Sequence, residues 1–111
     1  NIEVVYMNID KIKTQKILEG KAELLRAIAH PVRLCILTKL IFDGASNVTN
    51  MQNCLNVPQS TVSQHLAKLR SAGVVEKTRN GLEIHYELKN QDVRKILEIL
   101  LNINEGVTFN G

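Results

Sequence analysis

Apolar residues recur every three or four positions along most of the chain, and one shorter stretch alternates between apolar and polar residues. The first pattern is typical of helices with one buried side, and the second of a strand with one buried face. The helix that begins at Pro31 is apolar on nearly all sides, so we expect it at the centre of the core. Helices are predicted over residues 10–29, 31–42, 58–72 and 90–103.

The segment before the third of these helices completes a predicted helix-turn-helix unit over residues 49–72. Thr49 and Gln52 fit a capping box, in which a hydroxyl begins a helix and an amide three residues later completes the cap. A short helix to Leu55 and a tight turn at 56–58 then lead into the helix 58–72. The last predicted helix has Asn90 as its expected cap.

A β-hairpin is predicted over residues 74–88, directly after the helix-turn-helix unit. Asn80-Gly81 is a strong signal for a hairpin turn. The residues after it alternate, and we expect one dry face, formed by Leu82, Ile84, Tyr86 and Leu88. A hairpin in this position is called a wing. The predicted fold is therefore mainly α with a small β-hairpin, a winged helix-turn-helix in a single domain over residues 1–111.

The helix 58–72 combines a buried stripe of Val62, Leu66 and Leu69 with a polar opposite side. Short side chains on that side allow close approach to a DNA major groove, and Gln64 is long enough to bond a base edge. A merely solvated face is the alternative, although such faces usually carry Glu and Lys one turn apart. The polar side consists of Ser60, Gln64, Ala67 and Ser71, flanked by Thr61, Ser63 and Lys68.

Positive charge is concentrated in residues 58–81. The chain has 14 Lys and Arg against 11 Asp and Glu, a net charge of +3. The segment 58–81 alone carries a net +3, because Glu76 is its only acid. We expect these bases to contact phosphates, with an ordinary charged hairpin as the alternative. The bases are Lys68, Arg70, Lys77 and Arg79, of which the last two point to the same side of one strand.

The order of the helices and two stretches of sequence resemble the ArsR/SmtB family of bacterial winged-helix repressors. The stretches are AHPVRL at 29–34 and PQSTVSQHLAKLRSAGVVEKTRNGLEIHYEL at 58–88, and the resemblance covers roughly residues 22–101. It implies a cytoplasmic homodimer, joined through helices 10–29 and 90–103, that binds an imperfect palindrome in double-stranded DNA and represses a nearby promoter. The family's DNA contacts carry over to Gln59, Ser60, Ser63 and Gln64 on the helix and to Lys77 and Arg79 on the wing.

The positions at which relatives bind metals carry no such ligands in this sequence. A Cys-x-Cys pair near the short helix would fall at Asn47 and Thr49, and neither supplies a thiolate. The last helix has Asp92 and Glu98 but no His for a histidine–carboxylate site. We therefore expect no metal and no cofactor, and the inducing signal stays open.

Cys35 and Cys54 are the only cysteines of the chain. A free cysteine behaves as a small hydrophobic residue, so packing in the core is the first interpretation of both. The alternative is a repressor that senses redox state through a thiol switch between them. Such a switch requires Cα atoms within ~7 Å and an accessible thiolate.

The histidines lack the spacing of metal ligands, and we expect His30 and His85 to be structural. His65 lies at the border of the buried stripe, where it either supports packing or contacts a phosphate. Arg33 is expected in a salt bridge, with a phosphate contact as the alternative.

Other classes of function find little support. No acid near Ser60, Ser63 and His65 orients the histidine, and no Gly-rich phosphate loop is present, so we expect no enzyme. Aromatic residues make up only 4%, which disfavours stacking on single-stranded nucleic acid. With no membrane-length apolar run and no visible secretion signal, a cytoplasmic protein is expected. A winged helix that docks proteins instead of DNA is the alternative from another class.

Overall fold

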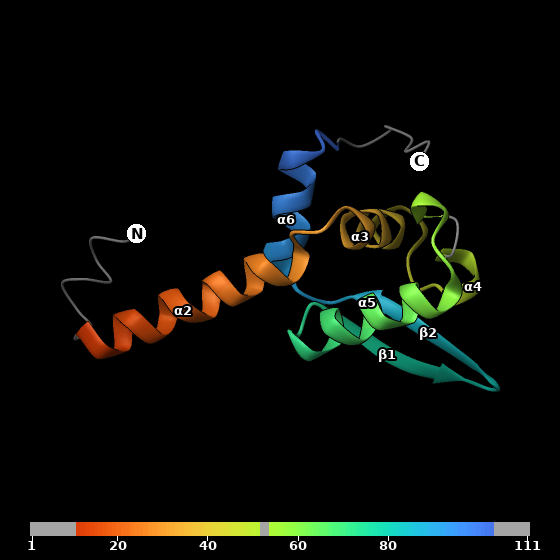
Figure 1. The fold of residues 1–111 in the computed structure, drawn as a ribbon, viewed down its shortest axis with the longest axis horizontal. Coiled ribbons are helices and arrows are strands. Elements are labelled where there is room, and N and C mark those ends of the chain that lie inside the picture. Colours follow the sequence, from red (N-terminus) through yellow and green to blue (C-terminus); the bar gives the residue numbers. More distant parts are fainter. Residues whose placement is uncertain (1–10, 52–53, 104–111) are drawn as a thin grey trace.

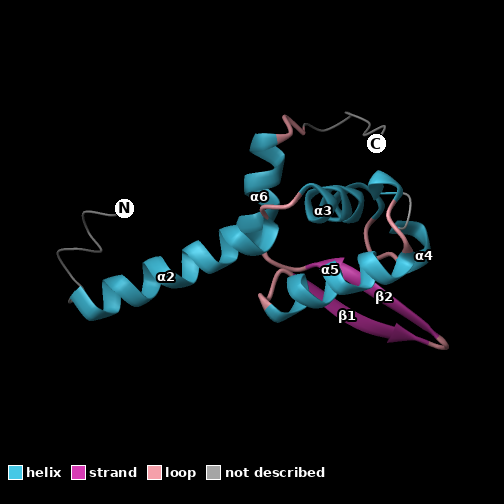
Figure 2. Cartoon of the chain, viewed as in Figure 1, coloured by secondary structure: helices cyan, strands magenta, loops and turns pink. Residues whose placement is uncertain are grey.

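A computed structural model describes residues 11–51 and 54–103, and its elements follow the predicted order (Figure 1). The fold is a mainly helical winged helix-turn-helix with one antiparallel hairpin, as predicted (Figure 2). The last helix ends earlier than expected, at Leu100 instead of 103. The elements are α2 (Lys11–Ile28), α3 (Pro31–Asp43), α4 (Val48–Met51), the 3₁₀ turn η1 (Cys54–Asn56), α5 (Gln59–Ser71), β1 (Val75–Asn80), β2 (Glu83–Leu88) and α6 (Gln91–Leu100).

The core lies around α3, which packs against η1, α5, β2 and α6. Its central residues Ile36 and Leu37 are completely buried, as the apolar pattern of this helix predicts. The stripe of α5 is also completely buried, and so are Val93 and Leu97 on α6. α2 projects away from this core as one uninterrupted helix (Figure 1). The core therefore fixes α5 and the base of the hairpin relative to α3.

Local chemistry at the helix ends explains where α3 and α6 begin and where α3 ends. Pro31 opens α3, and the Nδ1 atom of His30 accepts a hydrogen bond of 3.1 Å from the Val32 amide. Gly44 ends α3 with a φ of 73°, a conformation that favours glycine. Asn90 caps α6 by accepting from the Val93 amide at 3.0 Å, as predicted.

The capping box predicted at Thr49 is wrong. α4 begins at Val48, so Thr49 lies inside the helix, and the cap is supplied by the amide oxygen of Asn47, which accepts from the Asn50 amide at 2.9 Å. Asn is as good a cap as Thr, and its position two residues earlier sets the start of the helix. Gln52, the other half of the predicted box, lies outside the described residues.

The hairpin turns one residue later than the Asn-Gly pair predicts. Asn80 pairs with Glu83, which leaves Gly81 and Leu82 as the two turn residues. Gly81 has a φ of 67° while Leu82 has no positive φ, a combination typical of a type II′ turn. Leu82 is therefore fully exposed at the tip, and its predicted place on the dry face is wrong.

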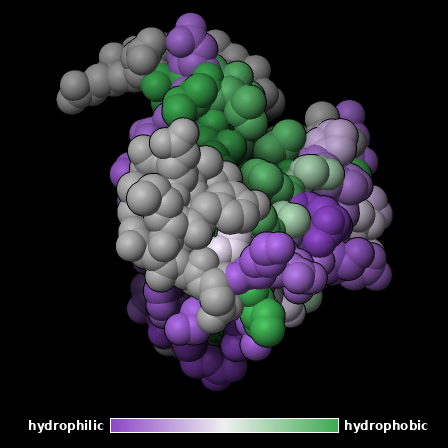
Figure 3. Space-filling model, turned by 90° about the vertical axis from the view of Figure 1, so that its left-hand side faces the viewer, coloured by the Kyte–Doolittle hydropathy of each residue, from purple (hydrophilic) through white to green (hydrophobic). Residues whose placement is uncertain are grey.

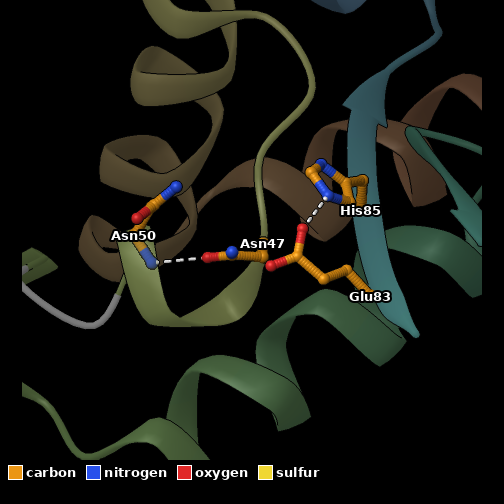
Figure 4. A network of polar contacts seen from close by, with 4 residues as sticks. All are labelled: Asn47, Asn50, Glu83 and His85. Atoms are coloured by element: carbon orange, nitrogen blue, oxygen red, sulfur yellow. Dashed lines mark hydrogen bonds and ion pairs between the residues drawn. The ribbon is translucent and has the colours of Figure 1, made fainter. Parts of the chain in front are cut away.

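A short bridge that the sequence did not reveal holds the hairpin to the segment before α4. Ser46 and Tyr86 exchange two backbone hydrogen bonds of 2.9 and 2.8 Å, and Ser46 is buried. Beside this bridge lie the Asn47 cap and a hydrogen bond of 2.9 Å between the Nε2 atom of His85 and the Glu83 carboxylate (Figure 4). At Tyr86, near the middle of β2, Ser46 therefore pairs with the two-stranded sheet in the manner of a third strand, one residue long.

Candidate nucleic-acid interface

The polar side of α5 is exposed to solvent, opposite the buried stripe. Ser60, Ser63 and Gln64 are exposed, and Thr61 is half-buried at the edge of this side. Gln59 and Lys68 are exposed as well, so every predicted contact residue on this helix reaches the surface. Because the residues that recur every three or four positions share the buried face of the helix, the polar residues between them point to the solvent side. This polar face of α5 is defined by Gln59, Ser60, Thr61, Ser63, Gln64 and Lys68.

The first turn of α5 also keeps backbone donors near the surface. Its N-cap is Pro58, which makes no side-chain hydrogen bond to the helix. The Pro58 carbonyl accepts from the amides of Thr61 and Val62 at 3.0 and 3.2 Å. Helix N-termini have N–H groups with no partner inside the helix, and phosphate oxygens are suitable acceptors.

The register of the hairpin sorts its charged residues onto two faces. Val75 pairs with Leu88, and both are buried, so this face of the hairpin meets the core. Lys77 opposite Tyr86 and Arg79 opposite Ile84 continue the same face outward, since directly paired residues point to one side. We call this the basic face of the wing. The other face carries acids, with Glu76 directly opposite Glu87 and Glu83 near the tip.

The bases of this region are not neutralised by nearby acids. Within the described residues, none of Lys68, Arg70, Lys77 and Arg79 forms a salt bridge. Glu76, the single acid of segment 58–81, pairs at 3.4 Å with Lys89. Because α5 packs against β1, the uncompensated charge of the wing lies next to the helix.

A polar cluster joins α5 to the start of α3. Arg33 donates from Nε to the Nδ1 atom of His65 at 3.1 Å and from a terminal nitrogen to the Ala27 carbonyl at 2.9 Å. The rings of His65 and His30 lie 4.4 Å apart between centroids. Arg33 thus forms no salt bridge within the described part of the chain, contrary to expectation, and it bonds to His65 instead.

The environment of His65 opposes its protonation. Burial lowers the pKa of His65 below 6.5, and electrostatic interaction with His30, Arg33 and Lys68 lowers it further. A neutral ring leaves Nδ1 free to accept from Arg33. Arg33 and Lys68 also line a cleft of about 570 Å³ between α2 and α5, together with Arg26 and Glu23.

The two cysteines are joined by a disulfide that links α3 to η1, with Cα atoms 5.8 Å apart. The prediction of two free core thiols is therefore wrong, although Cys54 does lie in the core. The pairing arises because α3 packs against η1. The sequence did not reveal this packing, because the two segments lie far apart along the chain. No cluster of three or more His, Cys, Asp or Glu that could hold a metal occurs among residues 11–51 and 54–103.

A second exposed surface is apolar and lies on α2 and α6. Ile12 is 70% exposed on α2 and Ile99 is 80% exposed on α6, and other aliphatic side chains of these two segments are exposed as well. Figure 3 shows hydrophobic surface gathered in a band toward the top of the view, where α6 ends in Figure 1. Among the described helices, none combines the length and apolar character that a membrane span requires. This apolar surface includes Ile12, Leu18, Leu25, Ile99, Leu100 and Leu101.

Comparison with known proteins gives a consistent result. Residues 28–78 match a family described as a helix-turn-helix domain. The transcriptional repressor PagR of Bacillus anthracis is 48% identical over 83 residues, which cover 75% of this chain and 83% of PagR. Its crystal structure superimposes with a TM-score of 0.71 at 46% identity, over 78% of this chain and 98% of that one. The HTH-type transcriptional repressor SmtB of Mycobacterium tuberculosis is 41% identical over 75% of this chain and 61% of SmtB.

A solved structure with lower sequence identity has the same fold. The transcriptional repressor BigR from Xylella fastidiosa superimposes with a TM-score of 0.70 at 30% identity, over 85% of this chain and 95% of that one. The fold, the exposed polar helix and the wing define a winged helix-turn-helix transcription regulator of the DNA-binding class. The chain belongs to the ArsR/SmtB family of transcriptional repressors, which are not enzymes.

Proposed function

We propose that this chain is a sequence-specific repressor that binds an imperfect palindrome in double-stranded DNA near the promoter it controls. The observation that carries the proposal is the combination of the polar face of α5, whose one charged residue is Lys68, with an adjacent basic face of the wing. The helix face suits base edges in the major groove, and the wing suits phosphates. The proposed contacts are Gln59, Ser60, Thr61, Ser63, Gln64, Lys68, Lys77 and Arg79.

The active form is proposed to be a symmetric homodimer. Exposed aliphatic side chains on α2 and α6 exceed what one small domain covers, and two-fold symmetry is the commonest form of oligomer. Each copy would be a single domain over residues 1–111, and residues 10–29 and 90–103 of each copy would form the interface. The two copies of α5 would then enter successive major grooves about 34 Å apart, which accounts for a palindromic site. A cytoplasmic location follows from the position of its DNA target.

The proposed repressor does not use the metal sites of its relatives. Asn47 and Thr49 occupy the positions of the Cys-x-Cys pair, and the amide oxygen of Asn47 already accepts from Asn50. Asp92 is exposed and pairs at 3.8 Å with Lys21. We propose no cofactor, and the inducing signal stays open.

Selection of bound sites from random duplex DNA, with and without added divalent metal, tests the operator and the metal proposal together. A palindromic consensus whose enrichment is unchanged by metal is expected. Failure to bind any duplex at low ionic strength would refute DNA recognition, and release of the selected DNA by metal would refute the absence of a metal site.

Gln64→Ala tests whether the polar face of α5 reads bases. The substitution should weaken binding to the selected operator by ~1–3 kcal/mol and relax the preference at one base position, because a bidentate contact is lost. Gln91→Ala is the matched control, since Gln91 is exposed at the start of α6 and is not among the proposed DNA contacts. Fluorescence anisotropy against operator and scrambled duplexes gives both affinities. Equal weakening on the two duplexes would show that Gln64 does not read sequence.

A further inference from the structure

The disulfide joins the buried central helix to the turn that leads into α5. Cys35 lies on α3, beside the completely buried residues Ile36 and Leu37. Cys54 opens η1 and is itself only 1% exposed. The bond closes a loop over a sequence separation of 19 residues, which contains all of α4. It therefore ties the first part of the helix-turn-helix unit to the core.

The position of α5 depends on this turn. The Cys54 carbonyl accepts from the Val57 amide at 3.4 Å, and Asn56 adopts a left-handed φ of 55°. Pro58, the N-cap of α5, follows immediately. Movement of η1 away from α3 would thus displace the first turn of α5, which carries Gln59 and Ser60.

The two sulfurs differ in how easily an oxidant can reach them. Cys35 is partly exposed, whereas Cys54 is buried. Lys39 lies one turn further along α3 on the same side as Cys35, and a neighbouring cation favours the thiolate, the form that reacts with oxidants. Cys35 is accordingly the group that an oxidant meets first, and Cys54 is placed to resolve the product.

We propose that Cys35 and Cys54 form a reversible thiol–disulfide switch, oxidised by hydroperoxides, whose disulfide form holds α5 ready for DNA. This inference rests on the proposed function of the chain. A disulfide that forms in a reducing cytoplasm is usually transient and often senses redox state. The oxidised form has the winged-helix arrangement that matches known repressors, so oxidation is expected to favour binding and reduction to weaken it.

The chemistry balances with a hydroperoxide as the oxidant. The Cys35 thiolate attacks a peroxide oxygen, the O–O bond breaks, and a sulfenic acid and one water form with hydrogen peroxide. The Cys54 sulfur then attacks the Cys35 sulfur, the S–S bond forms, the S–O bond breaks, and a second water leaves. Two thiols lose two electrons in total, which reduce the peroxide. A small-molecule thiol reverses the bond by thiol–disulfide exchange.

The test compares the full chain in its reduced form with the same chain treated with hydrogen peroxide. Alkylation followed by peptide mass spectrometry reports the linkage, and fluorescence anisotropy reports affinity for the selected duplex. We expect a Cys35–Cys54 linkage, binding tightened by about threefold or more because α5 is pre-organised, and a melting temperature higher by several degrees. A glutathione buffer with the cytosolic ratio of reduced to oxidised glutathione should reverse all three changes.

Cys35→Ser is the control, because Cys35 is partly exposed and serine is tolerated there with little cost in packing. It should bind like the reduced wild type and show no response to peroxide. A response in this variant would come from oxidation elsewhere, such as at methionine, and would count against the switch. If the variant does not fold, the comparison of wild type with and without reductant still decides the question.

The outcomes separate the switch from the proposed function. Equal affinity in both states, or no linkage after peroxide, overturns the switch while leaving DNA recognition intact. A linkage that glutathione cannot reduce shows a permanent structural bond and also overturns it. Absence of duplex binding in both states overturns the proposed function, and the switch with it.

Discussion

Two exposed surfaces of this molecule have opposite chemistry. The polar face of α5 and the basic face of the wing present short hydroxyls, two amides and bases without acid partners among the described residues. The apolar surface on α2 and α6 presents aliphatic side chains, among them Ile99, which is 80% exposed. Exposure alone is therefore uninformative about function in this chain. The chemistry of what is exposed separates the two proposed partners, double-stranded DNA for the polar and basic faces and a second copy of the chain for the apolar surface.

The two surfaces should also respond differently to solution conditions. Association through apolar area depends weakly on salt, because its driving force is removal of that area from water. Binding of the basic face to phosphates releases counterions, so its strength falls steeply as salt rises. Salt dependence can thus assign an effect of a substitution to one surface or the other.

The largest effect is expected from breaking the apolar surface. Ile99→Glu places a charge on it without disturbing the core, since Ile99 has almost no packing within the monomer. The chain should become monomeric by light scattering, and operator affinity should fall by about a hundredfold or more because only one half-site is engaged. Gln91→Glu, at the start of α6 and outside the apolar surface, changes the charge equally and should leave a dimer. A variant that stays dimeric would show that the interface lies elsewhere.

A smaller effect should distinguish the two faces of the wing. Arg79→Ala should weaken binding to every duplex and lower the salt slope by about 0.9, the value for one phosphate contact. Glu83→Gln, close by on the acidic face, is the control and should leave both quantities unchanged or slightly improved. If Arg79 and Lys77 can be neutralised without loss of binding, a protein-docking role for the wing gains support.

The smallest effect concerns the cluster that supports α5 from behind. The pKa of His65 lies below 6.5 in the folded chain, so the unfolded chain binds more protons as the pH falls past 6.5. The stabilising contribution is complete above that pH and is lost below it. Acidification should therefore lower the melting temperature of wild type more than that of His65→Gln, by about a degree or two. If the melting temperatures of the two proteins fall equally across this pH range, His65 makes no pH-dependent contribution to stability.

The sequence predicted most of the fold because its elements obey local rules. The buried stripe of α5, the proline that opens α3 and the Asn90 cap depend on residues within one or two turns. The exposed character of the polar face of α5 follows from the same periodicity, and the structure agrees with it.

The errors arose where spatial neighbours decide between local alternatives. Asn47 and Thr49 are both competent caps, and only the structure shows which one begins α4. Leu82 continues the alternation of its strand, but the register places it in the turn. The disulfide between Cys35 and Cys54 and the bridge at Ser46 join segments whose contact no spacing encodes.

The bridge between Ser46 and Tyr86 supports the hairpin near its middle. Tyr86 shares two backbone hydrogen bonds with Ser46 on one edge and is paired in register with Lys77 of β1 on the other, so β2 has a neighbour on both sides at this position. Beyond this bridge, Arg79 lies on the outer part of the hairpin, which ends in the turn at Gly81. If the wing binds DNA as proposed, Lys77 would meet the sugar-phosphate strand from the supported part of the hairpin and Arg79 from its outer end.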